Sequence, residues 1–239
     1  AKWGGFATKF LKFGEKTAAK YADELIVLSE GTRDYFKETY GRETVFIPNG
    51  IDVPNEKTAD IITKKYGLEK DGYILFLARI VPEKGLHYLI DAFMQTDTDK
   101  KLVIAGGVSH SGEYAKHIHD MAKDDRIIFT GFVEGDELWE LYYNCRMYVL
   151  PSDVEGMPIS LLEAMVCGCE CLVSDIDTAK NVVGEYGYTF KKSDVNDLKN
   201  KLCEILGKQK ADKAEQIEYV KNNYSWDEIT DRTLELYKK

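Results

Sequence analysis

Short, β-rich apolar runs alternate with helix-period segments along most of this 239-residue chain. Such alternation is typical of parallel βαβ units, in which a crossover helix follows each strand. It predicts an α/β fold with a doubly wound parallel sheet, which binds ligands outside the carboxyl ends of its strands. In the main series we expect strands at 73–78, 101–105, 127–130, 147–150 and 171–174, and helices at 86–94, 113–122, 136–143 and 159–166.

Residues 1–48 form a separate, shorter series. They hold about two helices and two strands, at 24–28 and 44–47, with Ser29 as the expected N-cap of the second helix. These elements are too few for a sheet with both faces covered. We therefore interpret this part as the remnant of an α/β domain whose earlier portion is absent.

A Pro-Asn-Gly turn signal follows the remnant and opens a hinge over residues 49–72. The second α/β domain is expected over 73–215. The chain ends in helical sequence over 216–239, where Ser225 begins a capping-box pattern. We expect this C-terminal helix to pack back on the remnant.

The charge balance is acidic, with 32 Lys and Arg residues against 41 Asp and Glu residues. We therefore expect no nucleic-acid partner, and an anionic ligand must be held by a few placed groups. The five cysteines are an odd number, which argues against a secreted disulfide framework and for the reducing cytoplasm. No apolar run approaches the roughly 20 residues that span a bilayer.

The opening segment, residues 1–20, is locally basic. A helix here combines lysines with aromatic residues, and Glu15 is its one acid. One interpretation is a packed helix with a solvated lysine face. The other is an amphipathic helix that lies on an anionic membrane, which would place the protein at the inner face of the cell membrane. The residues concerned are Lys2, Lys9, Lys12, Lys16 and Lys20 with Trp3, Phe6, Phe10 and Phe13.

The first motif with chemical content is the segment "RIVPEKG", which follows the strand expected at 73–78. Arg79 stands at the carboxyl edge of the sheet, and Lys84 stands beside the start of the next helix. A guanidinium and an ammonium at one edge suit a diphosphate, whose oxygens gain charge as a sugar departs. By itself the pair is weak evidence, because surface Arg and Lys residues near a helix start are usually solvated.

The second motif, residues 151–164, is more specific. A strand ends, a glycine-containing loop follows, and Pro158 suits the first turn of an apolar helix. Free backbone N–H groups at that helix start, near 159–161, form an anion site with the helix dipole behind it. Glu155 lies on the loop and Glu163 in the second helical turn.

A carboxylate close to a phosphate site would repel the phosphate, so Glu155 and Glu163 must bind another part of the ligand. Carboxylates accept hydrogen bonds from hydroxyls, and sugars and ribose are rich in them. A nucleotide sugar fits the whole set, with its diphosphate on Arg79, Lys84 and the helix start, its sugar hydroxyls on Glu155 and its ribose on Glu163. The alternative is a solvated loop glutamate and a helix salt bridge.

At this point a family resemblance is evident. The segment "EGMPISLLEAM" resembles the glutamate box of the retaining glycosyltransferase family four, and "LARIVPEKG" resembles its phosphate loop. "YADELIVLSEGTRDYFKETYG" and "FIPNGID" are similar to the end of the first domain and the hinge. "LVIAGG", "IIFTGFV" and "LYYNCRMYVLPSDVEG" follow in the family's order, so nearly the entire chain is covered.

The resemblance implies a GT-B fold, in which residues 73–215 are the Rossmann-like donor domain and residues 1–48 belong to the Rossmann-like acceptor domain. It implies that Arg79 and Lys84 bind the donor diphosphate. Glu155 would contact the transferred sugar and Glu163 the ribose. Further donor contacts are expected from the backbone of Val133 after Gly131, and from Gly156, Met157, Pro158, Ile159, Ser160 and Leu161.

The implied activity is hexosyl transfer with retention, by front-side attack in which a donor phosphate oxygen helps to deprotonate the acceptor hydroxyl. No cofactor and no essential metal are expected. The acceptor is a glycan or a lipid-linked sugar. Because the acceptor domain is mostly missing, we expect this fragment to bind donor weakly and to transfer poorly by itself.

The opening "AKWGGFATKFLKFGEK" is similar to bacterial rhamnosyltransferases of surface-polysaccharide assembly. It makes dTDP-rhamnose our first hypothesis for the donor, with UDP- and GDP-sugars as alternatives. Two other functions stay open. One is a module that binds a nucleotide sugar without catalysis, and the other is a GT-B sugar-nucleotide epimerase.

Some patterns suggest metal sites. Cys167, Cys169 and Cys171 alternate between a helix end and a buried strand with no histidine nearby, so we interpret them as structural thiols. The strings at 97–99 and 175–177 contain paired aspartates, as metal-dependent GT-A transferases do. The first precedes a strand and the second lacks the surrounding GT-A context, so we assign no metal to either.

Overall fold

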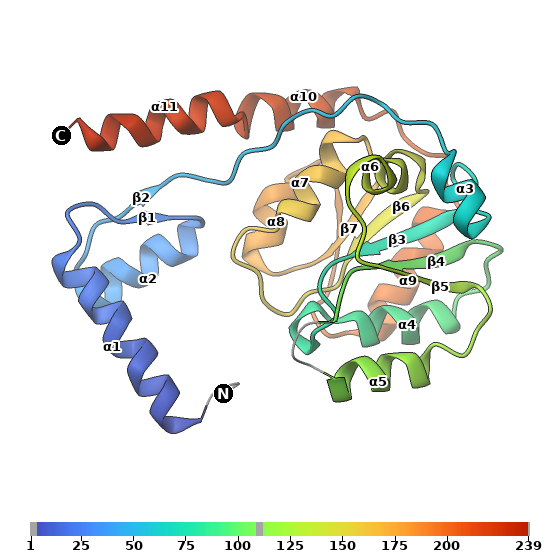
Figure 1. Ribbon diagram of the computed structural model, residues 1–239, viewed down its shortest axis with the longest axis horizontal. Helices are drawn as coiled ribbons and strands as arrows, with labels where there is room; N and C mark the ends of the chain where they lie inside the picture. The colour runs from blue at the N-terminus through green and yellow to red at the C-terminus, as the bar shows by residue number, and fades with distance from the viewer. Residues whose placement is uncertain (1–3, 109–111, 239) are drawn as a thin grey trace. The chain divides into compact units, whose positions relative to one another are not determined.

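The computed structural model describes residues 4–108 and 112–238. The chain divides into two compact units, drawn in Figure 1. The smaller unit joins Ala1–Gly50 with Tyr224–Lys239, and the larger unit is Ile51–Asn223. The domain boundaries expected from the sequence remain predictions; they are 1–48, 49–72, 73–215 and 216–239.

The larger unit is built on a six-stranded sheet in which all neighbouring strands are parallel. The strand order is β5-β4-β3-β6-β7-β8, so the chain runs outward from β3 on one side and from β6 on the other. This confirms the doubly wound α/β fold. The strands are β3 (Tyr73–Leu77), β4 (Lys101–Ala105), β5 (Ile127–Gly131), β6 (Met147–Leu150), β7 (Cys171–Ser174) and β8 (Tyr188–Phe190).

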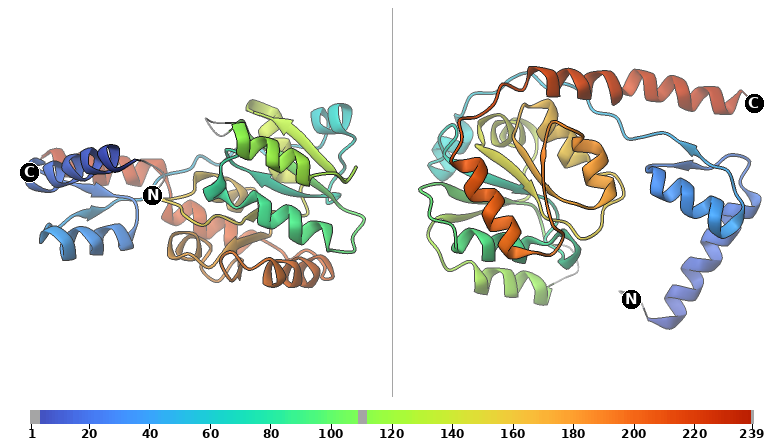
Figure 2. Two further views of the ribbon diagram at one scale, coloured as in Figure 1. Left: turned by 90° about the horizontal axis from the view of Figure 1, so that it is seen from below. Right: turned by 180° about the vertical axis from the view of Figure 1, so that it is seen from behind.

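Helices cover both faces of this sheet. Figures 1 and 2 show α4, α5 and α9 on one side and α3, α6 and α7 on the other. The helices of the larger unit are α3 (Ile61–Tyr66), α4 (Leu86–Met94), α5 (Gly112–Met121), α6 (Gly135–Asn144), α7 (Ile159–Val166), α8 (Asp177–Val183), α9 (Val195–Leu206) and α10 (Ala214–Asn223), with a short 3₁₀ turn, η1 (Pro82–Lys84).

The core follows from the period-two alternation of side chains along each strand. Phe76 of β3 and Ile104 of β4 pack in one buried cluster with Phe93 of α4. On the opposite face Tyr148 of β6 is fully buried, and its ring lies against Tyr142 of α6. Because both faces are covered, the strands are apolar throughout, which is why their positions were predictable.

Some elements were not predicted. The expected hinge contains α3, whose start is capped by a tertiary contact: the N–H groups of Asp60 and Ile62 donate to the carboxylate of Glu140. The edge strand β8 and helices α8 and α9 were also missed. β8 has three residues, of which Phe190 alone is fully buried, so its apolar signal is weak.

The smaller unit contains the parallel strands β1 (Ile26–Val27) and β2 (Val45–Phe46). Ser29 caps α2, accepting a hydrogen bond of 3.2 Å from the Thr32 N–H, as predicted. Ser225 stands at the N-cap of the last helix, but its side chain makes no capping bond, so that part of the capping-box prediction is wrong. The helices are α1 (Gly5–Tyr21), α2 (Glu30–Tyr40) and α11 (Trp226–Tyr237).

Helix α11 packs within the smaller unit. The guanidinium of Arg232 donates to the carbonyl of Phe46, at the end of β2, across 2.7 Å. The indole of Trp226 lies so close to Gly50 that a Cβ there would be 2.5 Å from a ring atom. Among the described residues, no helix has the length and apolar character needed to cross a bilayer.

Candidate functional site

The sheet order creates a topological switch point between β3 and β6. These strands are hydrogen-bonded neighbours, yet the chain leaves them toward opposite edges of the sheet. Ligands of doubly wound proteins bind in the crevice at such a point, outside the carboxyl ends of the strands. Arg79 and Lys84 follow β3, and Glu155 follows β6, so the structure places both predicted motifs at the carboxyl edge of the sheet, beside the switch point.

The two loops at the switch point are held together by their backbones. Gly85 has a left-handed φ of 67°, and a Cβ there would lie 2.0 Å from the carbonyl oxygen of Pro151. The N–H of Asp153 donates to the carbonyl of Glu83 across 2.9 Å. Only glycine allows this approach, and it fixes the positions of Lys84 and Glu155 relative to each other.

Lys84 and Glu155 form an ion pair. The Lys84 Nζ lies 2.6 Å and 2.7 Å from the two Glu155 carboxylate oxygens. Their side chains are 16% and 6% exposed. The Ser152 hydroxyl donates to the same carboxylate across 2.6 Å. From the sequence we predicted separate roles, with Lys84 as a phosphate ligand and Glu155 as a sugar ligand. In the structure the two side chains pair with each other, because a buried charge needs a partner of opposite charge.

Arg79 is exposed just after the end of β3. Its position at the sheet's carboxyl edge is as predicted. A solvated guanidinium in this loop is available to an anion that approaches the crevice.

The start of α7 provides backbone donors on the β6 side. Pro158 is the N-cap, with φ −77° and ψ 103°, and the helix proper begins at Ile159. The N–H of Leu161 already donates to the Pro158 carbonyl across 3.1 Å. Of the three amides expected to be free at 159–161, this one is therefore already used. Within the described chain, the N–H groups of Ile159 and Ser160 have no protein acceptor. These two amides and the helix dipole favour an anion here.

Glu163, in the second turn of α7, is partly buried. Burial raises the pKa of its carboxyl group above the ordinary value, while a hydrogen bond from the Tyr142 hydroxyl opposes that rise. The oxygen–oxygen distance of this bond is 2.8 Å. Burial raises the pKa of Tyr148 well above its ordinary value, its hydrogen bond with the Ser160 hydroxyl opposes the rise, and the charges of Glu155 and Glu163 add to it.

The proposed base contacts come from the end of β5. Gly131 has a φ of 74°, and its carbonyl accepts a hydrogen bond from the N–H of Gly106 across 2.8 Å. Val133 is buried, whereas Phe132 is 75% exposed. These residues share the carboxyl edge with the switch point, on the side of the sheet beyond β4.

Two supporting residues, Ser152 and Tyr142, were not predicted from the sequence. Ser152 stands three positions before Glu155 in the same loop. This short spacing is the local signal for the hydrogen bond between the two side chains. No local sequence pattern indicated the role of Tyr142, because its contact with Glu163 is a tertiary contact between α6 and α7.

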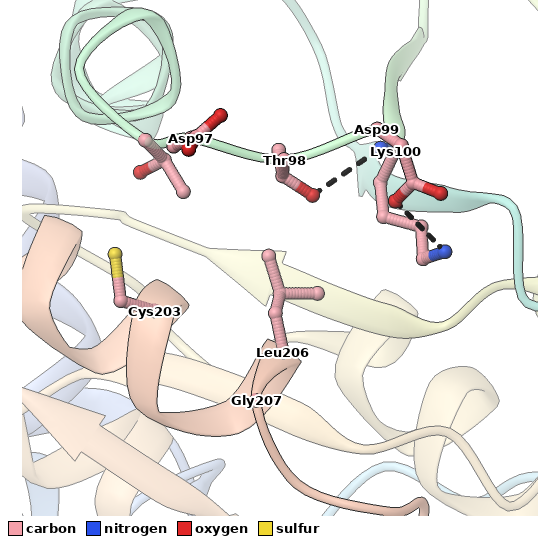
Figure 3. Close-up of a pocket in the computed structure, with 8 residues that line it drawn as sticks. Asp97, Thr98, Asp99, Lys100, Cys203, Leu206 and Gly207 are labelled. Carbon is pink, nitrogen blue, oxygen red and sulfur yellow. Dashed lines mark hydrogen bonds and ion pairs between the residues drawn. The ribbon is translucent and has the colours of Figure 1, made fainter.

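The aspartates of the 97–99 string lie away from this site. Figure 3 shows Asp97, Thr98 and Asp99 lining a pocket with Cys203 and Leu206. The string precedes β4 and therefore lies at the amino edge of the sheet. Asp99 pairs with the neighbouring Lys100 across 3.0 Å. In the described parts of the chain no three His, Cys, Asp or Glu side chains gather as metal ligands would, and the expected absence of a metal stays a prediction.

The cysteine stretch is part of the core. Cys167, Cys169 and Cys171 are buried and free, as is Cys145, whose sulfur lies 3.6 Å from that of Cys169. Burial raises the pKa of all three thiols of the stretch, so they stay protonated at neutral pH. Their placement agrees with a structural role.

Known proteins resemble this chain. O-antigen chain mannosyltransferase B of Escherichia coli is 27% identical over 187 residues, which are 74% of this chain and 48% of that protein. Alpha-maltose-1-phosphate synthase of Mycolicibacterium smegmatis is 26% identical over 94% of this chain and 65% of its own length. The chain thus spans about half to two thirds of these relatives.

Solved structures share the fold. The crystal structure of Anabaena Alr3699/HepE in complex with UDP and glucose superposes with a TM-score of 0.87 at 21% identity, covering 96% of this chain and 67% of that one. The fold is therefore that of GT-B glycosyltransferases. The family model described as Glycosyl transferases group 1 matches residues 58–224, which include Arg79, Lys84, Glu155 and Glu163. The chain belongs to the group 1 glycosyltransferase family.

Proposed function

We propose that this chain carries the donor-binding half of a retaining glycosyltransferase, which moves a hexose from a nucleotide-diphosphate sugar to a glycan or lipid-linked acceptor. The observation that carries the proposal is the Lys84–Glu155 pair at the switch point, beside the two free amides of α7. The switch point thereby has cations, amides and carboxylates on neighbouring loops, as a sugar diphosphate requires.

In the proposed complex the diphosphate lies between the two loops. Arg79 and Lys84 supply positive charge, and the amides of Ile159 and Ser160 supply neutral donors. An ammonium has three N–H bonds, so Lys84 can hold Glu155 and still donate to a phosphate oxygen. Glu155, fixed by Lys84 and Ser152, then accepts from a sugar hydroxyl.

The cations support the chemical step because charge develops on the departing diphosphate. In front-side attack, the acceptor oxygen bonds to the anomeric carbon on the face from which the diphosphate leaves. The bond from that carbon to the phosphate oxygen breaks, and the acceptor proton passes to a donor phosphate oxygen. Both Glu155 oxygens accept from Lys84, which favours a holding role over nucleophilic attack.

The donor is proposed at the level of a nucleotide sugar, with dTDP-rhamnose as the first hypothesis. UDP-sugars are its main competitors, because the similar Anabaena structure is a complex with UDP and glucose. GDP-sugars are the third class. Because sugar epimers differ by single hydroxyls, the donor has to be identified by binding measurements.

A calorimetric screen of UDP-, GDP- and dTDP-sugars against the wild-type chain and Glu163→Ala tests this function. We expect one class to bind and the variant to bind it more weakly. Equal binding by both proteins would remove the ribose role of Glu163, and no binding of any class would remove the proposed function. Incubation without acceptor, followed by product analysis, tests the epimerase alternative, because only an epimerase would convert the sugar nucleotide under these conditions. Incubation with an added glycan acceptor then separates transfer from the non-catalytic alternative.

We also propose that α1 contacts an anionic membrane. Its aromatic side chains Phe6, Phe10 and Phe13 lie on one stripe, at i, i+4 and i+7, and are 86%, 69% and 69% exposed. Lysines form an adjacent exposed stripe. In a chain of net charge −9, this local cationic and aromatic surface complements an anionic lipid interface. The lysines are Lys9, Lys12, Lys16 and Lys20.

A further inference from the structure

Beneath α7, the phenol of Tyr142 points its hydroxyl at the carboxylate of Glu163. The side chain comes from α6, is fully buried, and donates to the Glu163 Oε2 across 2.8 Å. We propose that Tyr142 is a positioning residue, which holds the carboxylate of Glu163 ionised and oriented for the ribose of the donor. This inference rests on the proposed function, because it assumes that Glu163 contacts the nucleotide.

Tyr142 is itself held on several sides. Its carbonyl oxygen accepts from the thiols of Cys145 and Cys169, at 3.3 Å and 3.1 Å. Its ring packs against Trp139 and Tyr148, with centroid distances of 6.0 Å and 5.9 Å. Because both its backbone and its ring are fixed, Tyr142 holds its hydroxyl in one place. The position of this hydroxyl therefore determines the orientation of the Glu163 carboxylate. The buried cysteines therefore act on the site indirectly, through Tyr142.

The bond gives Glu163 the properties that a ribose contact needs. A hydroxyl must find an acceptor, which an ionised carboxylate offers on both oxygens. Burial favours the protonated acid, which would offer one proton donor in place of an acceptor. The Tyr142 hydrogen bond opposes that effect and uses only one lone pair of Oε2, which leaves Oε1 to the ligand. Tyr142 thus compensates for the desolvation that the position of Glu163 imposes.

Three titratable side chains around this carboxylate do not titrate near neutral pH. They are the phenols of Tyr142 and Tyr148, on α6 and β6, and the thiol of Cys167 at the end of α7. Burial raises the pKa of each, so all three stay neutral. The charge of Glu155 also acts on Tyr148, and the Glu155 carboxylate is paired with Lys84. A change in ligand binding between pH 5.5 and pH 8, measured as the difference between wild type and a Tyr142 variant, therefore reports on Glu163.

The first test is Tyr142→Phe, assayed by calorimetry with UDP-glucose at pH 7, or with the GDP- or dTDP-sugar that binds better. Loss of a hydrogen bond to a charged group predicts a fall in affinity of about tenfold. The matched control is Tyr66→Phe. The Tyr66 hydroxyl also donates to a carboxylate, that of Glu137, across 2.8 Å, where α3 lies beside the start of α6. This variant should bind as the wild type does.

The pH dependence separates positioning from a general loss of structure. Binding should weaken as pH falls through the pKa of Glu163, and in Tyr142→Phe this weakening should begin at a higher pH. The loss should therefore shrink as pH rises from 6 to 8. A nucleotide sugar suits this test because its diphosphate is a diester with no ionisation near neutrality.

A double-mutant cycle gives the final test. In the Glu163→Ala background, Tyr142→Phe should cause no further loss of affinity. If Tyr142→Phe matches Tyr66→Phe at every pH while Glu163→Ala weakens binding, the positioning role is wrong and the proposed function survives. If Tyr142→Phe weakens binding equally in both backgrounds, its effect is structural and the inference is overturned. If no sugar nucleotide binds the wild type, the proposed function itself fails.

Discussion

The Lys84 ammonium lies within 2.7 Å of both Glu155 carboxylate oxygens, and the pair links the loop after β3 to the loop after β6. The two residues are 71 positions apart in sequence. Little of either side chain reaches solvent. Each charge therefore depends on the other, and the same pair is both a cross-link of the fold and a part of the proposed donor site.

Lys84→Met should damage both functions of the pair. It leaves the Glu155 carboxylate buried with only Ser152 as a partner, and breaking a buried pair in this way costs about 3 kcal/mol of unfolding free energy. Nucleotide-sugar binding should be lost as well. The double variant Lys84→Met, Glu155→Leu should recover most of the stability in a urea titration, because no unpaired charge remains, but none of the binding.

An exposed ion pair supplies the control. Lys64 and Asp60 pair across 2.8 Å, with side chains 72% and 63% exposed. Lys64→Ala should change the unfolding free energy by less than about 0.5 kcal/mol. A Lys84→Met protein as stable as the wild type would show that the pair does not cross-link the loops.

Arg79→Ala should separate binding from stability. Its side chain is exposed, so its loss should change the unfolding free energy by less than about 0.5 kcal/mol. Donor affinity should fall about tenfold, as for other charge-assisted contacts, and should depend less on salt than in the wild type. Lys123→Ala, which removes an exposed cation just after the end of α5, is the control in the same calorimetric titration. Equal salt dependence in the wild type and Arg79→Ala would exclude a diphosphate contact.

The sequence predicted the central sheet closely because strands covered on both faces are apolar throughout. The expected ranges for β4, β6 and β7 agree with the structure. Once the strand ends were known, topology placed Arg79, Lys84 and Glu155 at one edge, since parallel strands share their carboxyl side. This part of the site followed from local sequence patterns alone.

The polar contacts inside the site could not be predicted in this way. The bond from Tyr142 to Glu163 depends on how α6 lies beside α7, and the bond from Lys84 to Glu155 depends on the loop approach at Gly85. A residue's type gives its capacity for hydrogen bonds, whereas its partner depends on tertiary packing. For the same reason the cap of α3 by Glu140 left no local signal.

Gly85→Ala should disrupt the switch point. The new Cβ would meet the Pro151 carbonyl oxygen at 2.0 Å, and the φ of 67° is itself unfavourable for alanine. Strain and forced separation of the loops together predict a loss of about 2 to 4 kcal/mol in unfolding free energy. Gly31→Ala, in α2 with nothing within 4 Å, should leave stability unchanged or raise it. Similar urea midpoints for both variants would mean that the loops can part freely.

The lysine and aromatic stripes of α1 predict binding to anionic vesicles. The chain should sediment with phosphatidylglycerol vesicles at low salt and not with phosphatidylcholine vesicles, because each lysine near an anionic surface contributes about 1 kcal/mol. Replacing Lys9, Lys12, Lys16 and Lys20 by Gln should abolish sedimentation, and Phe10→Ser should weaken it at every salt concentration, since burial of its ring does not depend on charge. The matched control replaces four exposed lysines elsewhere, Lys116, Lys123, Lys191 and Lys221, by Gln. If this control loses as much binding as the α1 variant, attraction is not specific to the helix, and the proposed membrane contact of α1 is wrong.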